Sequence, residues 1–281
     1  MKLKQKLAIS YIRTKFKLLS HVSKRKTAEQ AFELFCTPLL KTHIKNRTVF
    51  KRAEPVYFIL NGLKVNGFRW NKDKPHKVLI LHGFGSSANN FHSYIIALLQ
   101  KNYQVLAFDA PAHGKSEGRT VNAMQYCQMI EKVIELYGPI DGFLAHSFGG
   151  IALSLAMEKT PHDENTRIVF IAPATETTTA IDSAFKLLQI NDEEIRTAFD
   201  SIIFEKGGYP TNWYSIKRAM KNIKASILWF HDENDDITPL ADALKVKEAG
   251  YKNIEFIITT GLGHRNIYRD QAVQRRVESF L

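Results

Sequence analysis

The sequence contains few cysteines and no hydrophobic run long enough to cross a bilayer. Its two cysteines, Cys36 and Cys127, are far apart among 281 residues and match no metal-binding or redox spacing. Both stand in apolar helical contexts, which favours buried free thiols in a reducing, cytoplasmic compartment. No stretch approaches the roughly 20 apolar residues that a membrane-spanning helix needs. The sequence therefore predicts neither a metal centre nor a transmembrane segment.

Acidic residues are scarce only in the N-terminal part. Residues 1–52 contain 14 Lys/Arg and 2 Asp/Glu, whereas the remaining residues contain 25 Lys/Arg and 26 Asp/Glu. The net charge of +11 therefore belongs to one segment, and the rest of the chain is close to neutral. This distribution is not that of a basic face for nucleic acid, which is not expected as a partner.

Residues 1–26 predict a basic amphipathic helix, because apolar residues recur at roughly helical spacing among nine Lys/Arg. A signal peptide is not expected, since the apolar run 7–12 is short, contains Ser10 and is followed by Arg13. Two interpretations stay open. The helix either lies on an acidic partner or an anionic membrane, at the inner membrane surface, or it is solvated and packs one face on the body of the protein.

A second helix is expected at residues 27–36, where Thr27 and Gln30 have the spacing of a capping box. After it, short apolar strands alternate with helices, which predicts an α/β fold whose mostly parallel sheet is covered by helices on both faces. Its first two strands are joined by Asn61-Gly62, a strong signal for an antiparallel hairpin. The expected strands are 56–60, 63–70, 78–81, 104–108, 142–145, 168–172, 226–231 and 254–259.

The interval 177–224 is longer than one crossover helix requires and predicts a small helical lid at the side where the strands end. Phe185, Phe199 and Trp213 are candidates for lining a substrate pocket there, and the alternative is that they pack the lid onto the body. The expected domains are a basic helical arm, residues 1–54, and a main domain, residues 55–281, with the lid inserted at about 177–224.

Ser147 stands where a buried strand changes directly into a helix, because the run 142–145 is apolar and helical spacing starts at Phe148. Such a turn holds its central residue at a strained, positive φ. The positions two residues to either side must then be small, and here they are Ala145 and Gly149. The turn would raise the serine hydroxyl above the sheet edge, close to the first N–H groups of the helix.

The segment Ala145-His146-Ser147-Phe148-Gly149 resembles the nucleophile elbow of the α/β-hydrolase superfamily, with Ala145 in place of the first glycine of GxSxG. The resemblance implies an acid and then a histidine later in the chain. The implied acid is Asp235, four residues before Pro239, and Asp232, Asp236 and Glu176 are the rival carboxylates. The implied base is His264, which ends a GxGH pattern at 261–264.

The resemblance also implies an oxyanion hole made of two backbone N–H groups, those of Phe148 and Phe84, the latter in a His82-Gly83-Phe84-Gly85 segment. His82 is expected to stabilise this loop, and His113, in a family-like turn at 109–116, is expected to be scaffold.

These features together predict a serine hydrolase that cleaves a carboxylic ester or thioester of a small-to-medium acyl group through an acyl-enzyme. The expected partner is a small molecule, with no metal and no cofactor. The alternative is a non-catalytic or membrane-surface-attached binding protein on the same scaffold.

Overall fold

The computed structural model describes residues 3–39 and 47–281 of the chain. The chain divides into two compact units. The sheet unit consists of residues 38–175 and 215–281, and the helical unit of residues 1–37 and 176–214. Residues 1–2 and 40–46 of the predicted basic arm lie outside the described residues.

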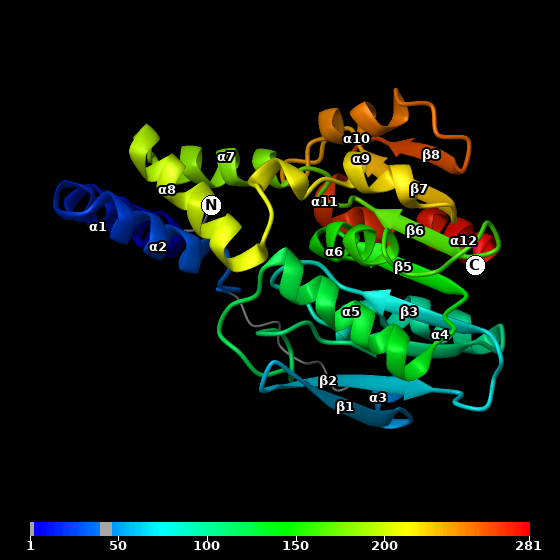
Figure 1. Ribbon diagram of the computed structural model, residues 1–281. Coiled ribbons are helices and arrows are strands. Elements are labelled where there is room, and N and C mark those ends of the chain that lie inside the picture. The colour runs from blue at the N-terminus through cyan, green and yellow to red at the C-terminus, as the bar shows by residue number, and fades with distance from the viewer. Residues whose placement is uncertain (1–2, 40–46) are drawn as a thin grey trace. The chain divides into compact units, whose positions relative to one another are not determined.

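The sheet unit is built on one eight-stranded sheet with the order β1-β2-β4-β3-β5-β6-β7-β8 (Figure 1). β1 pairs with β2, and β2 with β4, in antiparallel register, whereas every pair from β4 to β8 is parallel. The prediction of a mostly parallel sheet that starts with an antiparallel hairpin is therefore confirmed. The strands are β1 (Glu54–Leu60), β2 (Leu63–Trp70), β3 (Lys77–Leu81), β4 (Gln104–Phe108), β5 (Gly142–His146), β6 (Arg167–Ile171), β7 (Ser226–Asp232) and β8 (Ile254–Thr259).

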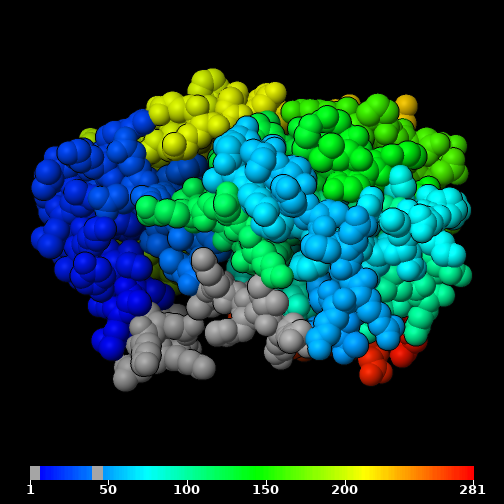
Figure 2. All heavy atoms as spheres, turned by 90° about the horizontal axis from the view of Figure 1, so that it is seen from below, coloured from blue at the N-terminus to red at the C-terminus, as the bar shows by residue number. Residues whose placement is uncertain are grey.

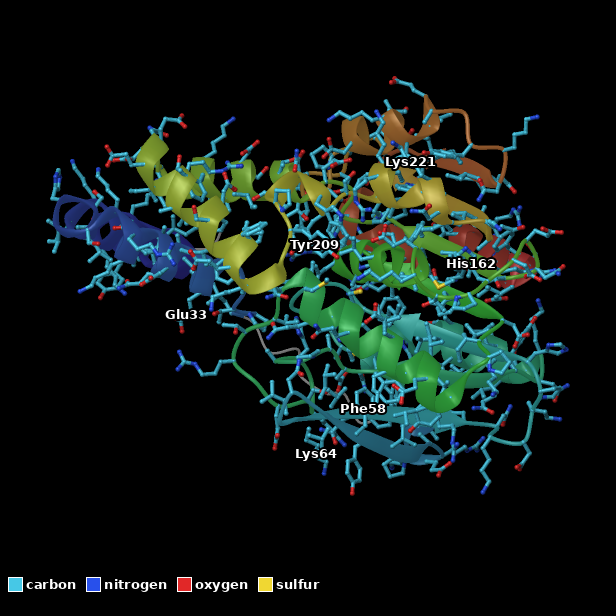
Figure 3. All side chains as sticks on the ribbon, in the orientation of Figure 1. Glu33, Phe58, Lys64, His162, Tyr209 and Lys221 are labelled. Atoms are coloured by element: carbon cyan, nitrogen blue, oxygen red, sulfur yellow. The ribbon has the colours of Figure 1, made fainter. Side chains whose placement is uncertain are left out.

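The hairpin turn forms at the predicted position because both of its central residues accept a positive φ, 49° at Asn61 and 79° at Gly62. Phe58 of β1, labelled in Figure 3, is buried, and its ring centroid lies 5.5 Å from that of Phe108. The hairpin is thus tied to the edge of the parallel sheet through apolar packing as well as through backbone pairing.

Helices cover both faces of the sheet, as predicted. Figure 1 shows α5 (Ala123–Tyr137) and α6 (Phe148–Met157) on one face and α4 (His92–Gln100) and α12 (Gln271–Phe280) on the other. A buried cluster joins α4 and α12 to alternate residues of the strands, such as Val78 and Ile80 of β3, because successive side chains of a strand point to opposite faces. The remaining helical segments of this unit are α3 (Thr48–Lys51), η1 (Ala88–Phe91), α9 (Ile216–Ala219), η3 (Met220–Asn222), α10 (Leu240–Lys247), α11 (Gly263–Asn266) and η4 (Ile267–Arg269).

The helical unit combines the start of the chain with the inserted segment. It contains α1 (Leu3–Val22), α2 (Lys24–Phe35), α7 (Thr177–Leu188), α8 (Glu193–Gly207) and η2 (Thr211–Trp213). α9 and η3, which fall in the last part of the predicted insertion, belong to the sheet unit. In the described part of the chain, α1 included, no helix has the length and apolar character needed to span a bilayer.

The predicted capping box of the second helix is wrong. α2 begins at Lys24, and its N-cap is Ser23, whose hydroxyl accepts a hydrogen bond from the N–H of Lys26. Thr27 is buried in the first turns of the helix, where its hydroxyl donates to the carbonyl oxygen of Ser23. Ser23 stands three residues before the N–H of Lys26 and caps the helix as well as a threonine would, so α2 starts earlier than the predicted Thr27.

Basic residues of α1 and α2 pair with the inserted helices. The guanidinium of Arg13 donates to the carbonyl oxygen of Leu187 at 2.7 and 3.0 Å, and that of Arg25 donates to both carboxylate oxygens of Glu205 at 2.9 and 2.6 Å. Lys24 forms an ion pair with Asp192. Part of the positive charge at the start of the chain is therefore matched inside the helical unit.

Candidate active site

Ser147 occupies the turn between β5 and α6 with φ 53° and ψ −121°, the strained conformation that the sequence predicts. Its N–H donates to the carbonyl oxygen of Ile171, and its own carbonyl oxygen accepts from Ala174. A Cβ at Gly149 would lie 2.9 Å from the carbonyl oxygens of Leu81 and His82, so only glycine fits there. Ala145, at the other flank, is fully buried, and the elbow accommodates its methyl group.

The imidazole of His264 lies between Ser147 and Asp235. Its Nε2 is 3.0 Å from the Oγ of Ser147, and its Nδ1 is 2.8 Å from Oδ2 of Asp235. A carboxylate only accepts hydrogen bonds, so the proton is on Nδ1 and the lone pair of Nε2 faces the serine hydroxyl. The three residues, which follow β5, β7 and β8, are 7%, 8% and 7% exposed. The structure thus brings together the three side chains that were predicted to act as a triad.

Asp235 is held as an anion by several donors. Its Oδ1 accepts from the N–H groups of Ile237 at 2.9 Å and Thr238 at 2.8 Å, and its Oδ2 accepts from the Thr238 hydroxyl at 2.9 Å. Burial by itself would raise the pKa of Asp235, but the hydrogen bond from His264, the attraction of that imidazole when it is protonated, and these N–H groups outweigh burial and lower the pKa. The carboxylate is therefore charged where it faces the imidazole.

The rival carboxylates lie elsewhere. Asp232 is buried and accepts from the N–H groups of Leu262 at 3.0 Å and Gly263 at 2.9 Å, so it holds the loop that carries His264. Asp236 is exposed. Glu176 is the residue before α7, in the helical unit. The role of Asp232 could have been suspected from its place at the end of a strand, but the sequence does not say which loop it holds.

His146 links the elbow to the histidine loop, a contact that the sequence did not predict. Its Nε2–H donates to the carbonyl oxygen of His264 at 3.2 Å, and its ring centroid lies 4.6 Å from that of Tyr268. Burial, and then repulsion by a protonated His264, lower the pKa of His146 to about 3, so its ring is neutral. A second buried histidine, His231, donates from Nε2 to the carbonyl oxygen of Thr238 at 2.7 Å, behind Asp235.

Two neutral histidines fix the loop that contains Phe84. His82 accepts the N–H of Ala110 at Nε2 (2.9 Å) and donates from Nδ1 to the carbonyl oxygen of Gly83 (2.8 Å). His113 accepts the N–H of Gly85 at Nε2, also at 2.9 Å. Burial lowers the pKa of each ring to about 4, which keeps both Nε2 atoms as acceptors.

The Phe84 loop lies directly beside the serine turn. A Cβ at Gly83 would be 2.9 Å from the Cβ of Ser147 and from Nδ1 of His146. Phe148 is the first residue of α6, so its N–H has no acceptor within the helix. In the described ranges 3–39 and 47–281, the Phe84 N–H donates to no protein acceptor. The rings of Phe84 and Phe148 meet edge to face with centroids 5.6 Å apart.

The three candidate pocket residues lie in the helical unit. Phe199 is 1% exposed, and its ring is enclosed by those of Phe32, Phe35 and Phe185, with centroids 5.7, 6.0 and 5.1 Å away. Trp213 stacks on Tyr209, which Figure 3 labels, at 3.7 Å. These contacts are packing within the helical unit. Packing of the lid onto the body and contact with substrate both stay predictions for all three residues.

Within the described part of the chain, no group of three or more His, Cys, Asp or Glu side chains is arranged to hold a metal ion.

Residues 73–199 match the family model described as serine aminopeptidase, S33. The chain is similar to a putative esterase/lipase of Mycoplasma pneumoniae, 26% identical over 108 residues, which covers 37% of this chain and 40% of that protein. It is also similar to the uncharacterized hydrolase YugF of Bacillus subtilis, 30% identical over 107 residues, which covers 36% and 39%. The chain thus matches about two fifths of the length of these relatives.

Among solved structures, an esterase from Pyrococcus furiosus matches with a TM-score of 0.65 at 19% identity, over 88% of this chain and 97% of that chain. At that identity the likeness shows the fold. The antiparallel start of the sheet, its parallel continuation and the serine turn after β5 agree with it. The chain therefore has the α/β-hydrolase fold.

Proposed function

We propose that this protein is a serine hydrolase that cleaves a carboxylic ester or thioester through an acyl-enzyme. The observation that carries the proposal is the hydrogen-bond chain from Ser147 through His264 to Asp235, with N···O distances of 3.0 and 2.8 Å. A serine hydroxyl is a weak nucleophile unless a neutral imidazole accepts its proton, and the imidazole needs a carboxylate to fix its tautomer.

In the first half of the reaction, Nε2 of His264 takes the proton of Ser147 while Oγ attacks the carbonyl carbon of the substrate. Negative charge develops on the carbonyl oxygen, and the N–H groups of Phe84 and Phe148 stabilise it. The imidazolium is stabilised by Asp235, and it then protonates the departing alcohol or thiol. In the second half, His264 activates a water molecule that attacks the acyl-enzyme and releases the acid.

For the substrate we propose a small molecule with a small-to-medium apolar acyl group. The Phe84 ring is exposed, the Phe148 ring is half-buried, and the two rings meet beside the proposed oxyanion donors. Apolar rings at this place favour an apolar substituent on the reacting carbonyl. Turnover of p-nitrophenyl esters from acetate to palmitate tests the acyl length, and a maximum at palmitate would contradict the proposal.

A fluorophosphonate probe tests the nucleophile. The protein should be labelled at Ser147 and should hydrolyse p-nitrophenyl esters, and Ser147→Ala should lose both properties, with kcat reduced by about 10⁴- to 10⁶-fold. Ser154→Ala, which changes a buried serine of α6, should keep both and serves as the matched control. Ester turnover that persists undiminished in Ser147→Ala would contradict Ser147 as the nucleophile. A parent protein that is neither labelled nor active on any of these esters would favour the alternative, a non-catalytic binding protein on this scaffold.

We also propose a reducing, cytoplasmic location, which the two buried free thiols Cys36 and Cys127 support. Cell fractionation with a thiol-specific label before and after unfolding tests it.

As a further partner we propose an anionic membrane surface at the inner side of the membrane. The nine Lys/Arg and the absence of Asp/Glu in residues 1–26 support this contact.

A further inference from the structure

α1 has apolar side chains on two opposite sides. On the inner side, Phe16 is 4% exposed, and Ile12 is half-buried, where the helix contacts α2 and α7. This side is the face that packs on other helices, one of the two interpretations that the sequence left open. It leaves a second set of apolar residues unexplained.

The second set consists of four residues on the outer side, called here the outer stripe: Leu7, Tyr11, Leu18 and Val22. They are 62%, 71%, 65% and 79% exposed, respectively. A single exposed leucine needs no explanation, but four exposed apolar residues on one side of a helix form a patch that does. With about 3.6 residues per turn, these positions fall within a sector of about 60°. Phe16, nine residues after Leu7, points about half a turn away. The outer stripe thus runs along one side of the helix, with the exposed Thr14 between Tyr11 and Leu18.

Positive charge borders the outer stripe on both sides. Lys15 and Lys17 are exposed and lie about 80° to either side of Leu7 around the helix axis. α1 contains no Asp or Glu. Figure 2 draws the atoms of α1 and α2 in dark blue.

We infer that the outer stripe docks on an anionic phospholipid bilayer, with its apolar side chains at the boundary between headgroups and acyl chains and the two lysines at the phosphates. The inference deepens the proposed membrane contact by naming the face that makes it. Tyr11 suits this position because its ring is apolar and its hydroxyl is polar. A second copy of the chain is disfavoured as the occupant, because two outer stripes in contact would bring lysines together without an acidic residue of α1 between them.

Vesicle flotation of the full chain tests the inference. The protein should float with vesicles of equal parts phosphatidylcholine and phosphatidylglycerol, and it should stay unbound with phosphatidylcholine alone. Leu18→Ser combined with Val22→Ser should weaken binding at least tenfold, because the apolar area of both side chains is lost. Lys15→Gln combined with Lys17→Gln should weaken it by about fivefold per lysine.

Leu136→Ser, which changes a residue of α5 that is 47% exposed, is the matched control and should bind like the parent protein. Circular dichroism and turnover of a water-soluble p-nitrophenyl ester should be unchanged in all variants, because none of these residues lies in the serine site. Ser147→Ala should bind vesicles normally, so loss of hydrolysis and loss of membrane binding are separate results.

Three results would overturn the inference. Absence of binding to the anionic vesicles would remove the membrane contact altogether. Binding that the Leu18→Ser/Val22→Ser variant retains in full would place the contact on another face. A dimer in light scattering that this variant converts to a monomer would assign the outer stripe to a second copy.

Discussion

Nε2 of His146 lies 3.2 Å from the carbonyl oxygen of His264, so the residue before the proposed nucleophile binds the backbone of the proposed base. The two residues are 118 positions apart in the sequence. Because the side chain of His264 must reach Ser147 within hydrogen-bond distance, a bond that fixes its backbone also fixes the reacting geometry.

His146→Phe tests this contact, because it keeps an aromatic ring against Tyr268 and removes the donor. We expect kcat to fall by about two- to tenfold, the value of one hydrogen bond, with KM nearly unchanged. Steady-state kinetics on a p-nitrophenyl ester measures both. His146→Gln, which supplies an amide donor, should recover part of the loss. If the phenylalanine variant matched the parent kcat, a positioning role for His146 would be wrong.

Asp235→Asn should lower kcat by about 10⁴-fold, because an amide at this place would favour the wrong tautomer of His264. Glu176→Gln is the comparison, since it changes the rival acid, and it should keep kcat near the parent value. The two variants are assayed side by side on the same ester. If Glu176→Gln lowered kcat more than Asp235→Asn did, the acid of the triad would be Glu176. The 2.8 Å contact between Asp235 and His264 would then not be the catalytic one.

Gly149→Ala should destabilise the protein by about 1–3 kcal/mol, because the new Cβ would press on two backbone carbonyl oxygens at 2.9 Å. Ala145→Gly is the matched change on the other side of Ser147, and it restores the first glycine of the family pattern. It should cost only about 0.5–1 kcal/mol, the entropy of a glycine in a strand. Urea unfolding followed by circular dichroism measures both free energies, and equal costs would refute the steric argument.

Stability should fall as the pH drops from about 6.5 to about 4. Burial lowers the pKa of His82 and His113 to about 4, whereas the unfolded chain takes up these protons near pH 6.5. The unfolded state therefore binds more protons in this range, and the free energy of unfolding decreases by an amount on the order of a few kcal/mol.

Urea unfolding at pH 7 and pH 5 checks this prediction, with His113→Gln as the comparison. Burial raises the pKa of Asp109, which acts in the opposite direction in both proteins, so the difference between them isolates the share of His113. The parent should lose more stability than the variant. A slope that is the same in both proteins would show that His113 does not carry a lowered pKa.

Local patterns account for the strands and for the serine turn. The strands 104–108 and 254–259 have the predicted bounds, and Asn61-Gly62 forms the predicted hairpin. These features were predictable because alternation, apolar runs and a positive φ depend on residues within one element. The start of α2 was not predictable in the same way, because Ser23 and Thr27 are both good caps and the choice depends on how the helix packs.

Local sequence patterns did not predict the contacts between distant segments of the chain. The sequence treated the apolar residues of 1–26 as one face, whereas Phe16 is buried and Leu7 and Val22 are exposed on another side of α1. The ion pair between Arg25 and Glu205 joins the start of the chain to the insertion, and neither segment predicts the other. For the same reason the role of Asp232, which holds the loop before His264, became visible only in the structure.

The sequence by itself determined the order of the strands along the chain, the serine turn and the residue types of the proposed triad, because each depends on neighbours a few positions away. The tertiary structure decided that His264 reaches both Ser147 and Asp235, and which apolar side of α1 stays in contact with solvent. Those outcomes depend on how strands and helices from distant parts of the chain pack, and packing is set by shape and burial rather than by local spacing.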